Sequence, residues 1–108
     1  MIINEDRLHL ALKYRAETDR TEPQLRREMR IAELKAKTVK STVYLYGEGS
    51  VADRTAKAEI SEEYQKAALE YIDAECAHGE VKNKRESEAI NVEVWRSENS
   101  SRNKGNIT

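Results

Sequence analysis

The sequence has little of what a compact globular core requires. Its 108 residues include no Phe, one Trp, one Pro, four Gly and one Cys, and 36% of them are charged. An average domain carries about 25% charged residues, and 18 of the 41 apolar residues here are small Ala or Val. A large hydrophobic core within a single chain is therefore excluded, and we expect stability to come from the pairing of long helices and from self-association.

Long hydrophobic runs and an excess of one charge are also missing. No stretch approaches the roughly 20 apolar residues of a membrane span, and no basic flank with an apolar run follows Met1. We therefore expect a cytoplasmic protein without membrane contact. The formal net charge is −1, which excludes a generic polyanion binder, so any nucleic-acid surface must be local.

Capping signals and apolar periodicity predict a single helical domain over residues 1–98, with helices at about 5–18, 22–46 and 61–98. Asn4 is the expected N-cap of the first helix. Pro23 interrupts the chain after that helix, although a kinked continuous helix fits the same residues. Residues 99–108 have almost no apolar content, and we expect them to form a flexible tail.

A turn is predicted at residues 47–50, because Gly47 and Gly49 end the second helix and permit a reversal. Ser50 begins a short helical turn from Val51, and Ser61 caps the longest helix.

Two stretches of the chain repeat apolar positions at strict 4-3 spacing, which is the pattern of a coiled-coil seam. In the second helix the seam consists of Leu25, Met29, Ala32, Ala36, Val39, Val43 and Tyr46. In the third it consists of Ile60, Tyr64, Ala67, Tyr71, Ala74, His78, Val81, Arg85, Glu88, Val92 and Trp95.

A second stripe, Ala68, Ile72, Cys76 and Gly79, flanks the longer seam, and a helix with two such stripes needs two neighbours. Because the third helix is longer than the second, the simplest fold is all-α: a long antiparallel, coiled-coil-like hairpin with a short N-terminal helix alongside it. We expect it to oligomerise, with Ile72, Cys76 and Trp95 at the interface. Core packing is the competing interpretation for Trp95.

The charges divide the chain into a basic and an acidic segment. Residues 20–40 carry a net charge of +4, and residues 41–80 carry −6. One interpretation is that these charges select the partner helix across the hairpin. The other is a basic strip for phosphates made of Arg26, Arg27, Arg30, Lys37, Lys40, Arg54 and Lys57, with Tyr44 and Tyr46 as stacking platforms.

Catalytic and cofactor chemistry find no support in the residue pattern. Cys76 and His78 are two positions apart, so on a helix they point in different directions and cannot form a nucleophile and base pair. His9 shows no metal-ligand spacing to either residue. The glycines at 47 and 49 lack the ending of a phosphate loop. We predict no enzyme activity, no metal and no cofactor.

The run KSTVYLYGEGSVADRTAKAE at residues 40–59, with Tyr64 and the helix ending Val94-Trp95-Arg96-Ser97, resembles small helical proteins from the DNA-metabolism regions of tailed phages. The basic helix, the Tyr-x-Tyr-Gly run and the Arg/Lys-bearing segment after the loop are also similar to the UvsY recombination mediators. The likeness covers roughly residues 25–98. It implies rings that bind single-stranded DNA and load a recombinase, with Lys40, Arg54 and Lys57 as phosphate contacts.

The leading hypothesis is therefore a phage accessory protein of DNA recombination or replication that scaffolds single-stranded DNA or a recombinase in the host cytoplasm. Several weak phosphate sites on one assembly would gain affinity through multivalency. Two alternatives stay open. One is a helical module that binds a host or phage enzyme without touching nucleic acid, and the other is a structural or assembly component of the phage particle.

Overall fold

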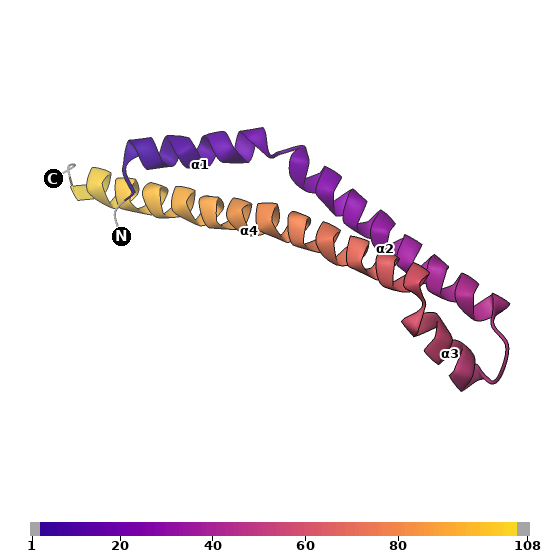
Figure 1. Cartoon of the computed structure of the whole chain (residues 1–108). Coiled ribbons are helices and arrows are strands. Elements are labelled where there is room, and N and C mark those ends of the chain that lie inside the picture. The colour runs from indigo at the N-terminus through magenta and orange to yellow at the C-terminus, as the bar shows by residue number, and fades with distance from the viewer. Residues whose placement is uncertain (1–2, 106–108) are drawn as a thin grey trace. The chain divides into compact units, whose positions relative to one another are not determined.

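Four helices make up nearly all of residues 3–105, which are the residues that the computed structural model describes (Figure 1). They are α1 (Glu5–Glu17), α2 (Thr21–Tyr46), α3 (Val51–Ile60) and α4 (Glu62–Gly105). Within these described residues there is no strand. The predicted all-α class and antiparallel helical hairpin are confirmed, and α3 shows that the short helical turn after Ser50 is a helix of 10 residues.

Contacts divide the chain into two compact units. The first unit contains the chain up to Glu22 together with the chain from Glu80 onward, and the second unit is Pro23–Gly79. Helix α4 contributes its C-terminal part to the first unit and its N-terminal part to the second.

In the first unit, α1 packs along the C-terminal part of α4 (Figure 1). Leu8, Ala11 and Val92 form its buried cluster, and Trp95 packs against it half-buried. Because Ala11 is fully buried, the helices approach closely at that point. Asn4 is the N-cap, as predicted: its side chain accepts a hydrogen bond of 2.8 Å from the backbone N–H of Arg7.

The break between α1 and α2 is short, and backbone hydrogen bonds continue through it. Thr18, Asp19 and Arg20 form a turn, and the N–H of Glu22 bonds to the carbonyl of Thr18 at 3.1 Å. Pro23 therefore lies in the first turn of α2, where its missing N–H costs no helical hydrogen bond.

In the second unit, α2 and the N-terminal part of α4 pack antiparallel along the predicted seam. Ala36 and Ala67 are buried, and His78 is a buried polar residue of the same seam. Most of the other predicted seam positions, such as Met29 and Tyr71, are half-buried. Small residues at the contact let the two helices lie close together, but they bury little apolar surface.

One end residue of each predicted seam lies outside the helix contact, so the prediction is wrong for Tyr46 and for Ile60. Tyr46 is 86% exposed because α2 ends there and the chain turns away. Ile60 is 76% exposed because it is the last residue of α3, not part of the long helix. The extended backbone of Ser61 separates the two helices, and its hydroxyl accepts from the N–H of Tyr64 at 3.3 Å, so the phase of the seam begins only at Tyr64.

The reversal at residues 47–50 depends on Gly49, whose φ is +108°. A side chain is strained in that backbone conformation, and a Cβ there would also lie 3.2 Å from the carboxylate of Asp53. Ser50 then caps α3 by accepting a hydrogen bond of 3.2 Å from the N–H of Asp53.

The predicted flexible tail is wrong for residues 99–105, because α4 continues through them to Gly105. Ser, Asn, Arg and Lys are tolerated in a helix, and a growing helix adds one hydrogen bond per residue without a new nucleus. Low apolar content therefore did not end this helix. Residues 106–108 of the predicted tail lie outside the described residues.

Candidate functional site

Four of the predicted phosphate-binding residues lie on the N-terminal two-thirds of α2, with exposed side chains. Arg26, Arg27 and Arg30 line a shallow groove together with Pro23, Ile31 and Leu34. Lys37 lies farther along the helix and forms an ion pair of 2.9 Å with Glu33, whose pKa the hydrogen bond from Lys37 lowers.

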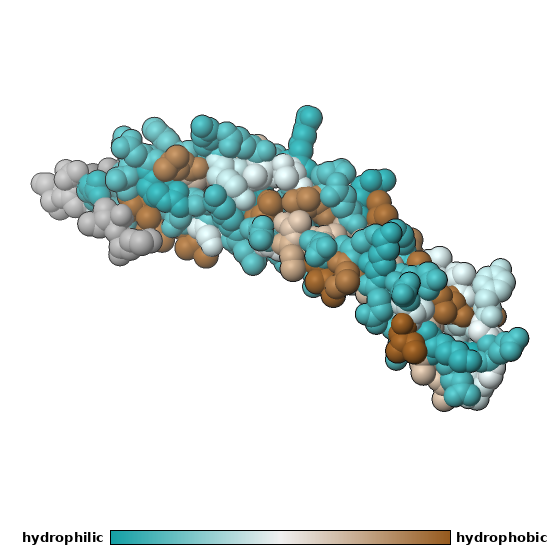
Figure 2. Space-filling model, in the orientation of Figure 1, coloured by the Kyte–Doolittle hydropathy of each residue, from teal (hydrophilic) through white to brown (hydrophobic). Residues whose placement is uncertain are grey.

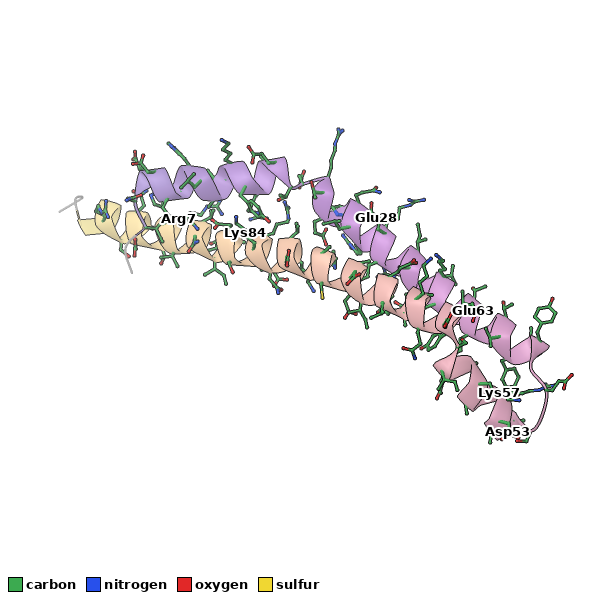
Figure 3. All side chains as sticks on the ribbon, in the orientation of Figure 1. Arg7, Glu28, Asp53, Lys57, Glu63 and Lys84 are labelled. Atoms are coloured by element: carbon green, nitrogen blue, oxygen red, sulfur yellow. The ribbon has the colours of Figure 1, made fainter. Side chains whose placement is uncertain are left out.

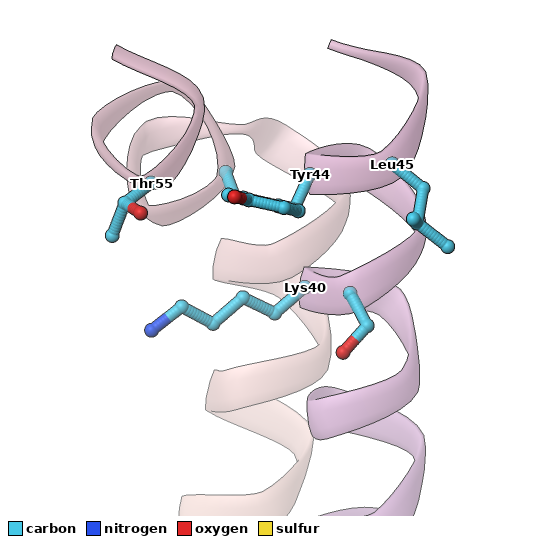
Figure 4. Close-up of a pocket in the computed structure, with 6 residues that line it drawn as sticks. Lys40, Tyr44, Leu45 and Thr55 are labelled. Atoms are coloured by element: carbon cyan, nitrogen blue, oxygen red, sulfur yellow. The ribbon is translucent and has the colours of Figure 1, made fainter. Parts of the chain in front are cut away.

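Lys40 is held by the chain's own side chains. Its ammonium lies 3.4 Å from a carboxylate oxygen of Glu59 on α3 and 5.5 Å from the ring centroid of Tyr64 on α4. The side chain is half-buried and points from α2 toward α3 (Figure 4). Lys40 therefore ties three helices of the second unit together through an ion pair and a cation–π contact.

Arg54 and Lys57 also have partners within the second unit. The Arg54 guanidinium lies 5.6 Å from the ring centroid of Tyr44, and its Nε is buried without a hydrogen-bond partner. The ammonium of Lys57 donates to the backbone carbonyl of Glu48 in the turn at 3.2 Å (Figure 3). These two residues hold α3 against the end of α2.

The seven predicted basic residues thus fall into two sets. The α2 set, which is exposed, is Arg26, Arg27, Arg30 and Lys37. The turn set, whose charged groups contact other parts of the second unit, is Lys40, Arg54 and Lys57. A phosphate must displace contacts between different elements to bind the turn set, whereas the contact of Lys37 with Glu33 lies within α2, so the turn set is the poorer phosphate surface.

A cavity of about 360 Å³ opens between α2 and α3 (Figure 4). It is lined by Lys40, Ser41, Tyr44, Leu45, Thr55 and Ala58. Its one charged group, Lys40, already pairs with Glu59, and the Thr55 hydroxyl donates to the carbonyl of Val51. The cavity therefore offers a small molecule few polar groups that are not already engaged within the chain.

The three predicted interface residues have different surroundings. Ile72 is half exposed and Cys76 is exposed, so both are accessible to a second copy. Trp95 packs on Leu8, Ala11 and Val92 within the first unit. This packing accounts for Trp95 without any second copy.

Sequence reasoning missed a further exposed apolar stripe on α2. Ile31, Leu34 and Leu45 lie on the side of the helix opposite the seam, and each is about half exposed or more. Ile31 and Leu34 are three residues apart, Thr38 follows four residues later, and Leu45 follows after a further seven. This spacing repeats the heptad of the seam, so it could have revealed the stripe in the sequence. On α4, Leu69 is likewise exposed beside the predicted Ile72 and Cys76.

Two long-range polar contacts of the first unit were also missed. Arg7 binds both carboxylate oxygens of Glu88, one of them at 2.8 Å. Arg85 donates to the carbonyl of Arg15 and to the hydroxyl of Thr18, each at 2.7 Å, and so caps the C-terminus of α1. The partners are far apart in sequence, and the only signal was that Arg85 and Glu88 stood at polar seam positions.

Among the described residues, no group of three or more His, Cys, Asp or Glu side chains is arranged to hold a metal ion. None of the helices of residues 3–105 has the length and apolar character that crossing a membrane requires. No protein-family model matches the chain, and no curated protein or solved structure matches it either.

Proposed function

We propose that the protein is a non-enzymatic helical scaffold that works as a homo-oligomer, as an accessory protein of phage DNA recombination or replication in the host cytoplasm. The main support for self-association is that Ile31, Leu34, Leu69 and Ile72 are exposed on the outer sides of the α2–α4 pair. The resemblance of residues 40–59 to phage DNA-metabolism proteins supports a role in phage DNA recombination or replication.

The balance of buried and exposed apolar residues supports self-association. Among the described residues no large side chain is fully buried, and Ala contributes most of the buried apolar positions. Hydrophobic side chains at least half exposed instead appear among polar ones on the surface (Figure 2). Fully burying a Leu or Ile side chain contributes roughly 1.5–3 kcal/mol, so covering these positions in an assembly would add substantially to a thin core.

The test is the molar mass of the purified chain as a function of concentration, by light scattering and sedimentation equilibrium. We expect a mass that exceeds the 12.4 kDa monomer and a melting temperature that rises with concentration, because association stabilises the folded state by mass action. A monomer at every concentration up to about 1 mM, well above the μM range of weak specific complexes, contradicts the proposal.

Contact with single-stranded DNA is a second candidate function, favoured by the α2 set. Arg26, Arg27 and Arg30 lie on two consecutive turns of one helix around a shared groove. Exposed Arg side chains at this density attract phosphates, and several copies on one scaffold would multiply a weak affinity.

An oligonucleotide-binding series in increasing salt tests this second candidate. If the three arginines neutralise three phosphates, the log–log slope is about −2. Replacing them together by Ala should abolish binding, whereas the matched replacement of exposed Lys13, Arg20 and Arg96, which removes the same charge elsewhere, should weaken it only slightly. No binding at 50 mM salt eliminates DNA contact and leaves a protein such as a recombinase as the scaffold's ligand.

A further inference from the structure

Helix α2 has an outer stripe on the side that faces away from α4. The α2 outer stripe consists of Ile31, Leu34, Thr38, Ser41 and Leu45, which alternate at three and four residues. Leu34 at its centre is 66% exposed. The stripe spans 15 residues, a rise of about 21 Å along the helix, which is long enough to receive another helix over four turns.

Helix α4 has a matching outer stripe in the second unit. The α4 outer stripe consists of Gln65, Leu69, Ile72, Cys76 and Gly79, again at alternating spacings of four and three. Leu69 is 59% exposed, and a Cβ built on Gly79 would meet no atom within 4 Å. This stripe also spans about 21 Å, so the two stripes have the same period and the same length.

The charges beside the two stripes are opposite in sign. Exposed Arg27, Arg30 and Lys37 accompany the α2 outer stripe. Exposed Glu62, Asp73 and Glu75 accompany the α4 outer stripe, together with the base Lys66. A stripe paired with its own copy would bring like charges together, whereas α2 against α4 brings basic and acidic side chains together.

We propose that the α2 outer stripe of one copy docks on the α4 outer stripe of the next copy, which gives head-to-tail association. This inference rests on the proposed function, because it specifies how the copies of the scaffold associate. Each stripe faces away from the partner helix of its own hairpin, so one copy presents its two docking faces on opposite sides of the second unit. Such an interface closes into a ring or continues as a filament.

Copies that stack in the same orientation place α2 antiparallel to the neighbour's α4, as it is within the chain. The stripe centres then coincide, and Thr38 lies opposite Ile72 of the next copy. In this register Leu34 meets Cys76, and Ile31 meets Gly79, where the missing side chain admits the larger one.

Charge reversal in two steps tests the pairing by light scattering at one concentration and one salt. Lys37→Glu should lower the association constant about fivefold, because in this register Lys37 lies opposite Asp73 of the next copy, and Asp73→Lys should do the same. The chain that carries both reversals should associate within about threefold of the native chain, because opposite charges again meet at that position. Helix content by circular dichroism checks that each variant is folded.

The outcomes separate the pairing from the scaffold itself. A native chain that stays monomeric overturns the proposed function and this inference together. If the native chain is an oligomer and charge reversal on α2 leaves its mass unchanged, only the inference is overturned. That result would indicate that each stripe pairs with the same stripe of another copy, because the reversal would then exchange one like-charge contact for another. Loss of oligonucleotide binding at unchanged mass overturns it too, and assigns the basic face of α2 to nucleic acid.

Disulfide trapping tests the register. The native chain has one thiol, so oxidation can link it at most into dimers through Cys76. With Leu34→Cys, oxidation should produce a ladder of trimers and larger species on a non-reducing gel. The control Leu12→Cys, on an exposed position of α1, should produce at most one-tenth as much of the higher species. Equal ladders from both variants contradict the register.

Discussion

Arg7 of α1 and Glu88 of α4 form a two-pronged ion pair across 81 positions of sequence. Glu88 is only 5% exposed, whereas the Arg7 side chain remains 38% exposed. The arginine thus satisfies a carboxylate that the first unit buries beside its small apolar cluster. The hydrogen bonds from Arg7 hold the pKa of Glu88 below its ordinary value near 4.5.

This pair predicts an acid-dependent loss of stability. Because the pKa of Glu88 is lower in the folded chain than in the unfolded chain, the pair stabilises the fold above pH 4.5, and that contribution disappears as the pH falls through the lower folded-state pKa. The Glu88→Gln variant removes the titration. We expect its unfolding free energy to fall less than that of the native chain between pH 5 and pH 2.5.

Urea unfolding at several pH values, followed by circular dichroism, measures this difference. Glu86→Gln is the matched control, because Glu86 is an exposed carboxylate of the same helix. If the Glu88 and Glu86 variants follow the same profile, the Arg7 contact has no role in acid stability.

Arg85 gives a prediction about the C-terminal end of α1. Its guanidinium binds the carbonyl of Arg15 and the hydroxyl of Thr18, two acceptors at the end of that helix. Replacing Arg85 by Met should destabilise the chain by about 1–2 kcal/mol, because it leaves these acceptors without a cationic donor. Arg85→Lys should recover part of the loss, since one ammonium cannot reproduce the geometry of a guanidinium.

Chemical denaturation measures both variants against Lys82→Met, which removes an exposed cation from the same helix and should change stability by less than about 0.5 kcal/mol. A loss for Lys82→Met as large as that for Arg85→Met would mean that net charge, and not the cap, accounts for the effect.

The seams were predictable because they depend only on residue spacing. Ala67, His78, Glu88 and Val92 are all buried at positions that the 4-3 period assigns to the contact side. The same period failed at Ile60, because a single residue, Ser61, takes an extended backbone and resets the helical phase. The spacing of apolar residues does not reveal such a local interruption. It is found only if the capping residue Ser61 is taken as the boundary between two helices.

The candidate site was less predictable, because a charged residue's role depends on its partners. Lys37 and Lys40 are three residues apart and looked equivalent in the sequence. The structure leaves Lys37 exposed beside its ion-pair partner Glu33 on α2, whereas the half-buried Lys40 points at Glu59 and Tyr64 on two other helices. Only the register of α2 against α3 and α4 determines which lysine has its partners on other helices.

The fully buried Ala11 predicts a strict size limit between α1 and α4. Its relative exposure is 0%, with Leu8 and Val92 in the same cluster. Ala11→Leu adds three carbon atoms where no space exists, and we expect a destabilisation of about 1–3 kcal/mol from overpacking. Ala16→Leu, on an exposed position of the same helix, should stay within about 0.5 kcal/mol in the same urea titration. Equal effects would show that α1 does not pack closely at Ala11.

Gly79 predicts opposite effects on the single chain and on the assembly. In mid-helix a Gly→Ala replacement raises helix stability by about 1 kcal/mol, and nothing within the chain obstructs the added methyl group. At concentrations where the chain is monomeric, Gly79→Ala should therefore raise the urea midpoint. At concentrations where it associates, the methyl group occupies the space for Ile31 of the neighbouring copy, so the association constant should fall about tenfold. Ser97→Ala is the control, because it improves helix propensity at an exposed position of α4 that lies 18 residues beyond Gly79, and it should leave association unchanged. Association that strengthens with Gly79→Ala would show that no helix of a second copy approaches α4 at this residue.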